Sequence, residues 1–237
     1  MLSVKRTLLI TGASSGIGRA IAKRLLQAGH TVIGTSRNCS QFNVNHPNFS
    51  FIELDLSQPK QISPKLKALE KAFPQLDGVI FSAGYGQFGA IEQFSFAQIE
   101  QMMTVNFTSQ ALITRALIPN LKRKTQSNLI YIGSEAALKG SRKGSIYCAS
   151  KFALRGFTQA LSDECGSSSV RVSLINPGMV KTNFFDSLFF QPGDGETHGL
   201  LAEDIAETVD YILNSNKNMV IDEINLNPAN KVIKFKK

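Results

Sequence analysis

The sequence has no tryptophan, only three cysteines and no long apolar run. Cys39, Cys148 and Cys165 are an odd number without paired spacing, so they favour neither a disulfide framework nor a zinc site, and we expect no bound metal. No apolar run approaches the ~18 residues that span a bilayer, and Met1–Arg6 lacks the apolar core of a secretory leader. These absences predict a cytoplasmic protein without a membrane partner.

Acidic residues are also in the minority, with 18 Asp and Glu against 26 Lys and Arg, a net charge of +8. The basic residues are scattered, with small clusters at Lys122–Lys124, Arg142–Lys143 and Lys231–Lys237. No aromatic ladder interleaves them, as a binder of single-stranded nucleic acid requires. We therefore predict no nucleic-acid partner and assign the excess charge to a solvated surface.

Strand-like and helix-like segments alternate along the whole chain. The predicted strands are 7–11, 31–35, 49–54, 78–82, 128–133, 170–175 and 218–224, and the predicted helices are 16–28, 59–73, 96–121, 145–165 and 202–213. Regular β-α-β alternation predicts an α/β fold, a doubly wound parallel sheet of about seven strands with helices on both faces. No linker divides the chain, so we expect one domain spanning 1–237, with ligands beyond the carboxyl ends of the strands.

A glycine-rich turn joins the first predicted strand to the first helix. It reads Gly12-Ala13-Ser14-Ser15-Gly16-Ile17-Gly18. Glycines permit a tight turn and close backbone approach, and the helix N-terminus offers free N–H groups to a phosphate. No Lys-Ser or Lys-Thr pair follows the glycines, so the turn is not a P-loop.

The same turn also matches G-x-S-x-G, the nucleophile elbow of α/β serine hydrolases, with Ser14 as nucleophile. His198 lies downstream, preceded by Asp186 and Asp194, so the order Ser, Asp, His is available. An elbow needs a sheet assembled around its strand, and this strand begins only a few residues from Met1. The hydrolase is therefore the weaker alternative.

Ser36-Arg37 follows the second predicted strand, where a site for NAD usually places a carboxylate on the ribose. The chain has no Asp or Glu between Gly18 and Glu53, and a guanidinium can hold a 2′-phosphate. The pattern predicts NADP(H) as cofactor. The ends of the other strands are small, polar or turn-forming: Asp55-Leu56, Ser82-Ala83-Gly84, Gly133-Ser134 and Asn176-Pro177-Gly178.

Tyr147 and Lys151 are four residues apart on a predicted helix and share one face. A free phenol titrates near pH ~10, and a nearby ammonium favours the phenolate, so we expect the pair to bring the phenol into range for acid–base catalysis. Ser134, at the end of the fifth strand, can hold a substrate oxygen by a hydrogen bond.

Together these motifs resemble the short-chain dehydrogenase/reductase family in its compact single-domain, Rossmann-like form. The resemblance covers nearly the whole chain. It implies that Tyr147 is the catalytic acid/base, Lys151 lowers its pKa and binds the nicotinamide ribose, Ser134 positions the substrate, and Asn106 holds a water in the proton relay. The implied contacts with NADP(H) are Gly12, Ser14, Ser15, Gly16, Ile17, Gly18, Ser36, Arg37, Asp55, Leu56, Ser82, Ala83, Gly84, Tyr147, Lys151, Pro177, Gly178, Val180 and Thr182.

The resemblance also implies a reaction and an assembly. The expected activity is hydride transfer between NADP(H) and a small-molecule carbonyl or alcohol, with a non-enzymatic NADP(H) sensor as the alternative. Residues 183–201, rich in phenylalanine, would form the substrate lid, with a short helix that packs on the core as the alternative. A homodimer or homotetramer is expected. One departure stands out, because Phe81-Ser82 replaces the usual asparagine pair that braces the sheet.

Overall fold

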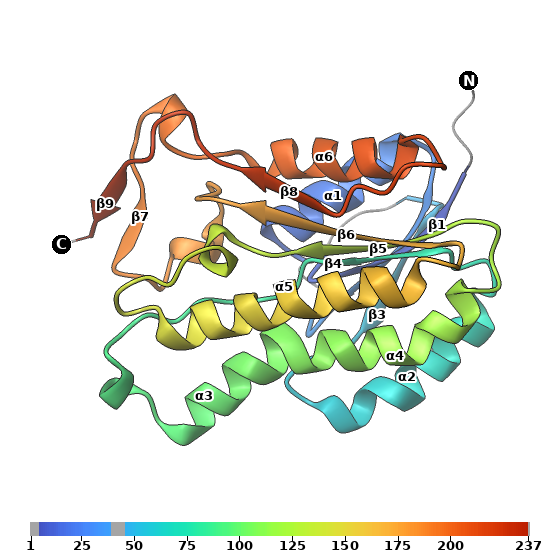
Figure 1. The fold of residues 1–237 in the computed structure, drawn as a ribbon, viewed down its shortest axis with the longest axis horizontal. Coiled ribbons are helices and arrows are strands. Elements are labelled where there is room, and N and C mark those ends of the chain that lie inside the picture. The colour runs from blue at the N-terminus through green and yellow to red at the C-terminus, as the bar shows by residue number, and fades with distance from the viewer. Residues whose placement is uncertain (1–4, 39–45, 237) are drawn as a thin grey trace.

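A seven-stranded parallel sheet forms the centre of the computed structural model, which describes residues 5–38 and 46–236 and so leaves Cys39 outside. The strand order is β3-β2-β1-β4-β5-β6-β8 (Figure 1). The strands are β1 (Thr7–Thr11), β2 (Thr31–Ser36), β3 (Phe49–Glu53), β4 (Gly78–Phe81), β5 (Ser127–Ile132), β6 (Val170–Pro177) and β8 (Glu223–Leu226). The order reverses between β1 and β4, which confirms the doubly wound, Rossmann-like sheet.

Helices cover both faces of this sheet (Figure 1). One face carries α1 (Gly16–Gln27) and α6 (Ala202–Asn214), and the other carries α2 (Pro59–Ala72), α4 (Ser109–Leu121) and α5 (Ser145–Cys165). No helix in the described part of the chain is both long and apolar enough to cross a bilayer. Most predicted boundaries agree with these bounds to within two residues.

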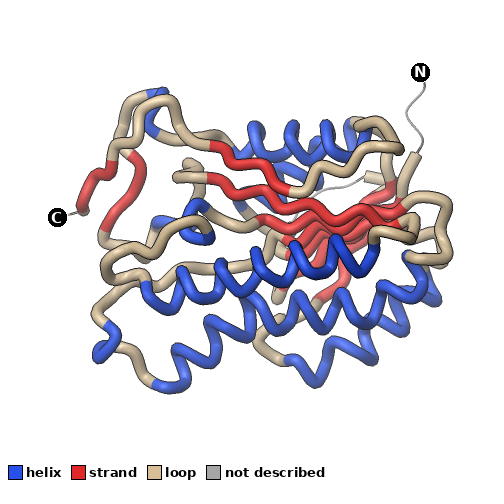
Figure 2. The backbone as a smooth tube through the Cα atoms, viewed as in Figure 1, coloured by secondary structure: helices blue, strands red, loops and turns tan. Residues whose placement is uncertain are grey.

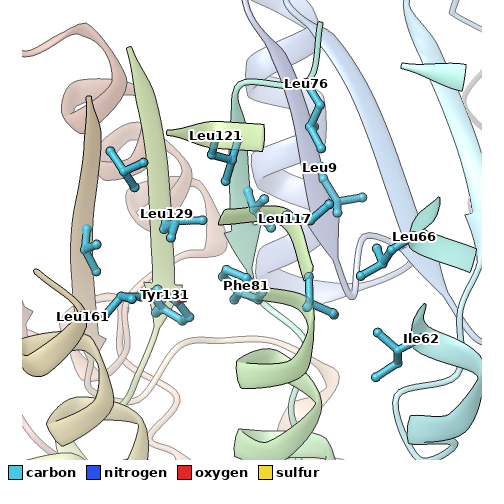
Figure 3. Close-up of a cluster of buried hydrophobic side chains, with 14 of the residues drawn as sticks. Leu9, Ile62, Leu66, Leu76, Phe81, Leu117, Leu121, Leu129, Tyr131 and Leu161 are labelled. Carbon is cyan, nitrogen blue, oxygen red and sulfur yellow. The ribbon is translucent and has the colours of Figure 1, made fainter. Parts of the chain in front are cut away.

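Each face of the sheet has its own hydrophobic core because side chains of a strand alternate between faces. In β1, Leu8 and Ile10 pack under α1 and α6, whereas Leu9 packs on the opposite side. Figure 3 shows this second core, where Leu9 and Phe81 meet Leu117 of α4. The central strands β1, β4 and β5 are largely apolar because both of their faces are buried.

The predicted helix over 96–121 is not continuous. It consists of α3 (Phe96–Met103), a π-helical segment at Thr104–Thr108 and then α4. Asn106 lies in the middle of the π segment and is fully buried. Hydrophobic periodicity does not reveal one wide turn inside a long helix, and such turns often occur at functional sites.

The last predicted strand, 218–224, is wrong over residues 218–222, because β8 begins only at Glu223. A turn lies at Lys217 and Asn218, and residues 219–222 have no regular structure. The carbonyl oxygen of Asn216 accepts from Met219 N at 2.8 Å, and its side-chain oxygen accepts from Asn218 N at 2.9 Å. The Asn216 side chain thus accepts a hydrogen bond from a backbone N–H group within the turn. In a strand, that N–H group would have bonded to a neighbouring strand.

A second, two-stranded antiparallel sheet was not expected. It pairs β7 (Phe190–Pro192) with β9 (Ile233–Phe235), in the register Phe190 to Phe235. Figure 2 shows this small sheet set apart from the main one, beyond the carboxyl ends of its strands. Strands of three residues joined over such a distance leave no periodic signal in the sequence.

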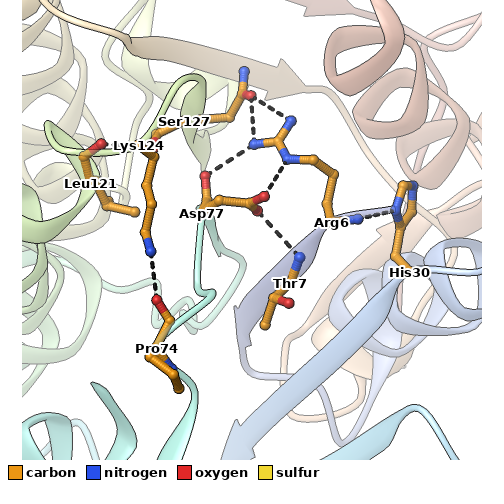
Figure 4. Close-up of polar contacts among 9 residues, drawn as sticks. Arg6, Thr7, His30, Pro74, Asp77, Leu121, Lys124 and Ser127 are labelled. Carbon is orange, nitrogen blue, oxygen red and sulfur yellow. Dashed lines mark hydrogen bonds and ion pairs between the residues drawn. The ribbon is translucent and has the colours of Figure 1, made fainter. Parts of the chain in front are cut away.

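A largely buried ion pair joins strands at the opposite end of the sheet (Figure 4). Arg6 Nε lies 2.9 Å from Asp77 Oδ2, and both Arg6 Nη atoms donate to Asn128 Oδ1 at 3.2 Å. Burial raises the pKa of the Asp77 carboxyl, and the Arg6 guanidinium counteracts that rise. These contacts join the starts of β1, β4 and β5 and leave their carboxyl ends for the site.

Candidate active site

A cavity of about 730 Å³ lies at the carboxyl ends of β4, β5 and β6. Its lining brings together many of the predicted site residues from separate loops. These are Ile17, Ser82, Gly84, Ser134, Tyr147, Lys151, Pro177, Gly178, Val180 and Thr182. The cavity is therefore at the edge where the fold is expected to bind ligands.

The glycine turn before α1 has the backbone shape that its sequence predicts. Gly12 and Gly16 have φ of +70° and +48°. A Cβ on Gly12 would come within 2.9 Å of Ala83 Cα, and one on Gly18 within 2.3 Å of the Gly12 carbonyl oxygen. Only glycine fits these positions without movement of the backbone.

A second cavity, of about 600 Å³, lies over this turn. Ser14, Ser15 and Gly16 line it, and Thr182 lines both cavities. The first turn of α1 holds no acidic residue, and the side chain of Ser15 does not cap the helix. Backbone N–H groups at this helix start can therefore serve a phosphate, so the residues present fit a dinucleotide.

Four predicted cofactor contacts lie at the ends of β2 and β3, outside both cavities. Arg37 is exposed, and Leu56 is buried. The Asp55 carboxylate accepts from both the backbone N and the hydroxyl of Ser57, at 2.9 and 2.8 Å. Ser36 Oγ donates to the Asn38 carbonyl at 3.0 Å. Arg37 forms no ion pair with any residue the structure describes, so its guanidinium is available to an anion.

Ser134, Tyr147 and Lys151 meet on one wall of the first cavity. The two α5 side chains come from adjacent turns, and the Lys151 Nζ lies 5.9 Å from the centre of the Tyr147 ring. Nζ also donates to the carbonyl of Ile132, at the end of β5, at 3.1 Å. All three side chains are at least nine-tenths buried, so the group is largely shielded from water.

In the free chain the phenol is not brought into the neutral range, and the expected effect of Lys151 on its pKa stays a prediction. Burial raises the pKa of Tyr147 to about 12, although a hydrogen bond with Ser134 acts in the opposite direction. Burial likewise lowers the pKa of Lys151 to about 8. Desolvation disfavours the charged form of each group and is the largest cause of both shifts. At neutral pH the phenol is therefore protonated and able to donate.

Asn106 lies behind the cavity wall and does not line it. Its side chain accepts from Tyr85 N at 3.0 Å and donates to the Tyr85 carbonyl at 3.0 Å and to Ser150 Oγ at 3.1 Å. These bonds fix the loop after β4 against α5. They make Asn106 a positioning residue, and its expected contact with a water stays a prediction.

Asn176 has a role in the site that the sequence reasoning missed. Its Oδ1 accepts from the backbone N of Ser134 at 3.2 Å, while its Nδ2 donates to Glu223 Oε1 and Asn225 Oδ1, both at 3.0 Å. A Cβ on Gly133 would lie 2.1 Å from the same Oδ1. The Asn-Pro-Gly motif indicated Asn176, but the residue that it contacts, Ser134, follows another strand, β5.

The structure shows what replaces the asparagine pair after β4. Phe81 stacks on Tyr131 with ring centres 4.4 Å apart and planes 5° from parallel. The hydroxyl of Thr11 accepts from the backbone N of Ser82 and of Ala83, both at 3.2 Å. An aromatic stack and a threonine thus brace this part of the sheet.

The structure does not assemble the hydrolase alternative. Ser14 lines the second cavity, and the described residues that line the two cavities include no histidine. His198 instead accepts from the backbone N of Gly195 at 3.1 Å, and Asp194 pairs with Lys234 at 2.5 Å. Among the described residues, the histidine that the hydrolase alternative requires is therefore not beside Ser14.

Comparison with known proteins agrees with this geometry. Residues 6–192 match the family model described as short chain dehydrogenase. This chain belongs to the short-chain dehydrogenase family. An uncharacterized oxidoreductase of Staphylococcus epidermidis is 31% identical to it over 97% of this chain and 100% of its own.

Two solved structures extend the likeness to this short-chain dehydrogenase. A serine dehydrogenase from Escherichia coli is 26% identical, with a TM-score of 0.81 over 93% of this chain and 96% of its own. An alcohol dehydrogenase from Thermococcus sibiricus, complexed with 5-hydroxy-NADP, is also 26% identical, with a TM-score of 0.86 over 95% and 97%. The protein is thus an oxidoreductase of this family.

Proposed function

We propose that this short-chain dehydrogenase interconverts a carbonyl and an alcohol with NADP(H), within one domain that spans 1–237. The observation that carries the proposal is the shared, buried wall formed by Ser134, Tyr147 and Lys151. That wall belongs to the first cavity. Thr182 lines both this cavity and the second one, which lies over the glycine turn. The cofactor supplies or accepts the hydride when bound.

The chain offers a separate group for each part of a dinucleotide. Backbone N–H groups of the turn around Ser14–Gly16 would hold the phosphates. Arg37 would hold the 2′-phosphate, because no acid in the segment before Glu53 repels it. Lys151 and Thr182, which line the first cavity, would hold the nicotinamide end.

The protein groups would act on the substrate oxygen. Ser134 donates a hydrogen bond to this oxygen and positions it beside the Tyr147 hydroxyl. In the direction of reduction, Tyr147 gives its proton to the oxygen as negative charge develops there. The phenylalanine-rich segment 183–201 would act as the lid that excludes water while this happens.

Substitution of Tyr147 by phenylalanine tests the proposal. We expect kcat for carbonyl reduction to fall by about 10²–10⁴-fold, the usual contribution of a general acid, while NADPH still binds. A panel of aldehydes and ketones, followed through NADPH absorbance, provides the measurement. Tyr211→Phe is the matched control, because the Tyr211 side chain is exposed on α6.

Two outcomes would contradict the proposal in different ways. Unchanged turnover in Tyr147→Phe would remove the tyrosine from the mechanism. Tight NADPH binding by the parent protein without turnover of any carbonyl or alcohol would favour the sensor alternative.

A further inference from the structure

The outer part of the cavity has an apolar wall of unusual composition. We call it the phenylalanine wall; its members are Phe88, Phe184, Phe185, Phe189, Phe190 and Phe235. Phe88 packs on Phe190 with ring centres 5.0 Å apart, and Phe189 packs on Phe190 at 5.2 Å. Phe88 and Phe184 also contact the Tyr147 ring, at 5.2 and 6.0 Å. The apolar surface therefore extends without a break to the proposed proton donor.

A group of positive charges lies along the same cavity. We call Lys139, Arg142 and Lys143, all in the segment between β5 and α5, the cationic rim. Among the residues that the structure describes, none of the three forms an ion pair. The one acidic residue in the lining, Glu135, is paired with Lys231. The rim charges are thus uncompensated by the protein.

The rim is attached to the phenylalanine wall. Lys143 Nζ lies 5.5 Å from the centre of the Phe189 ring, and the Lys143 carbonyl accepts from Gly89 N at 2.8 Å. Lys143 also has a φ of +63°, in the left-handed region that residues other than glycine rarely adopt. A strained residue held by contacts on two sides is typical of a functional position.

The rim is distinct from the expected phosphate site of the cofactor. Its three residues line the first cavity, whereas the turn at Ser14–Gly16 lines the second. Positive charges at the mouth of an apolar cleft attract anions more strongly than the same charges on an open surface. An anionic group bound at the cationic rim would therefore be part of the molecule in the first cavity and not a phosphate of the cofactor.

We propose that the substrate has an anionic end group, a carboxylate or a phosphate, joined through an apolar body to the reacting carbonyl or alcohol. The anion contacts the cationic rim, the body lies on the phenylalanine wall, and the reacting oxygen reaches Ser134 and Tyr147. This inference rests on the proposed function for the reacting end alone, since the rim and the wall can bind such a molecule without turnover.

Matched pairs of substrates test the charge preference. The probes are ω-oxocarboxylates of increasing chain length and their methyl esters, which keep the body and remove the charge; the corresponding ω-oxoalkyl phosphates distinguish carboxylate from phosphate. We expect kcat/KM to favour the anion over the ester by about tenfold at the best length, as one or two charged hydrogen bonds provide. Equal values for acid, phosphate and ester at every length would overturn the proposal.

A rim variant locates the preference. Arg142→Gln combined with Lys143→Asn removes two charges, and asparagine tolerates the left-handed backbone at position 143. We expect the ratio of kcat/KM between anion and ester to fall to near one. Lys217→Gln, an exposed lysine after α6, is the matched control and should keep the parental ratio. An unchanged ratio in the rim variant would contradict the assignment of these residues.

Equilibrium binding separates this proposal from the proposed function. Fluorine NMR can follow 4-(trifluoromethyl)benzoate and its neutral methyl ester, neither of which is an aldehyde, a ketone or an alcohol. Preferential binding of the benzoate that the rim variant loses, without turnover of any carbonyl, would leave the inference standing and remove the proposed reaction. Turnover of neutral carbonyls with no preference for anions in either assay would support the proposed reaction and overturn the anionic-substrate inference.

Discussion

At the scale of single residues, the sequence predicted which side chains gather at the candidate site but not their electrostatics. Ser134, Tyr147 and Lys151 lie together on the cavity wall, as their motif predicts. The ionisation of Tyr147 and Lys151 depends on how much water the fold removes, and spacing along a helix contains no information on that. The role of Asn176 was not predicted either. Asn176 lies on β6 and accepts from the backbone N of Ser134, which follows the neighbouring strand β5, and the sequence does not show this contact.

Lys151 is buried at a cost to stability, and this predicts a variant that is more stable and inactive. Burial lowers its pKa to about 8 in the folded chain from 10.5. Between these values the unfolded chain binds more protons, so this contribution to stability rises as pH increases from about 8 to 10.5. Below pH 8 the charged, buried lysine opposes folding in full.

We therefore expect Lys151→Met to raise the free energy of unfolding at pH 7 by roughly 2 kcal/mol, after a loss of about 1 for the unpaired Ile132 carbonyl. The gain should disappear as pH approaches the ordinary pKa of lysine, and turnover should be lost. Urea titrations across pH measure both limits, with Lys217→Met as control. A gain that does not change with pH would show that packing, not charge, is responsible.

Arg37 carries the prediction of cofactor preference. Its side chain is exposed and unpaired within the described residues, so a charged hydrogen bond to a 2′-phosphate is its expected use. Arg37→Ala should weaken NADPH binding by ~1–3 kcal/mol and leave NADH binding nearly unchanged. Fluorescence titration with both cofactors measures this, and tighter binding of NADH by the parent protein would refute the assignment.

At the scale of elements, periodicity predicted the regular helices and strands and failed where the chain departs from them. The π segment around Asn106 changes one turn inside a long amphipathic pattern, and the early part of 218–224 is a turn set by Asn216. The β7–β9 sheet depends on two short segments meeting in space. None of these features repeats, so no period reveals them.

The β9 strand is expected to hold the proposed lid in place. It pairs with β7, Lys234 bonds to Asp194, and Ile233 and Phe235 line the cavity. Truncation after Lys231 should leave the main sheet folded, because β9 lies outside it. We expect amides of residues 189–193 to exchange hydrogen faster and KM for apolar substrates to rise several-fold, since each buried CH₂ contributes ~0.8 kcal/mol.

Hydrogen-exchange mass spectrometry of the truncated and full chains measures the first effect, and steady-state kinetics the second. Phe235→Ala is the milder companion variant, because it removes one wall side chain and keeps the backbone ladder. Unaltered protection of residues 189–193 in the truncated chain would show that β7 does not depend on β9.

At the scale of the whole molecule, the sequence predicted the layer order because alternation of strands and helices permits few topologies. Arg6 and Asp77 join the strands at one end of the sheet, and the cavity lies at the other end. Assembly is harder to predict. Leu112 of α4 and Phe152 of α5 are 37% and 43% exposed, but a homodimer or homotetramer through these helices stays a prediction.

The family match ends at residue 192, whereas part of the cavity lining comes from residues 231–235. Ser134, Tyr147, Lys151, the cationic rim and five of the six phenylalanines of the wall lie within the matched residues, and Lys231, Ile233 and Phe235 complete the lining from outside them. Exchange of residues 231–235 between relatives is expected to change substrate selectivity while Ser134, Tyr147 and Lys151 stay unchanged. This short segment is therefore a target for engineering selectivity.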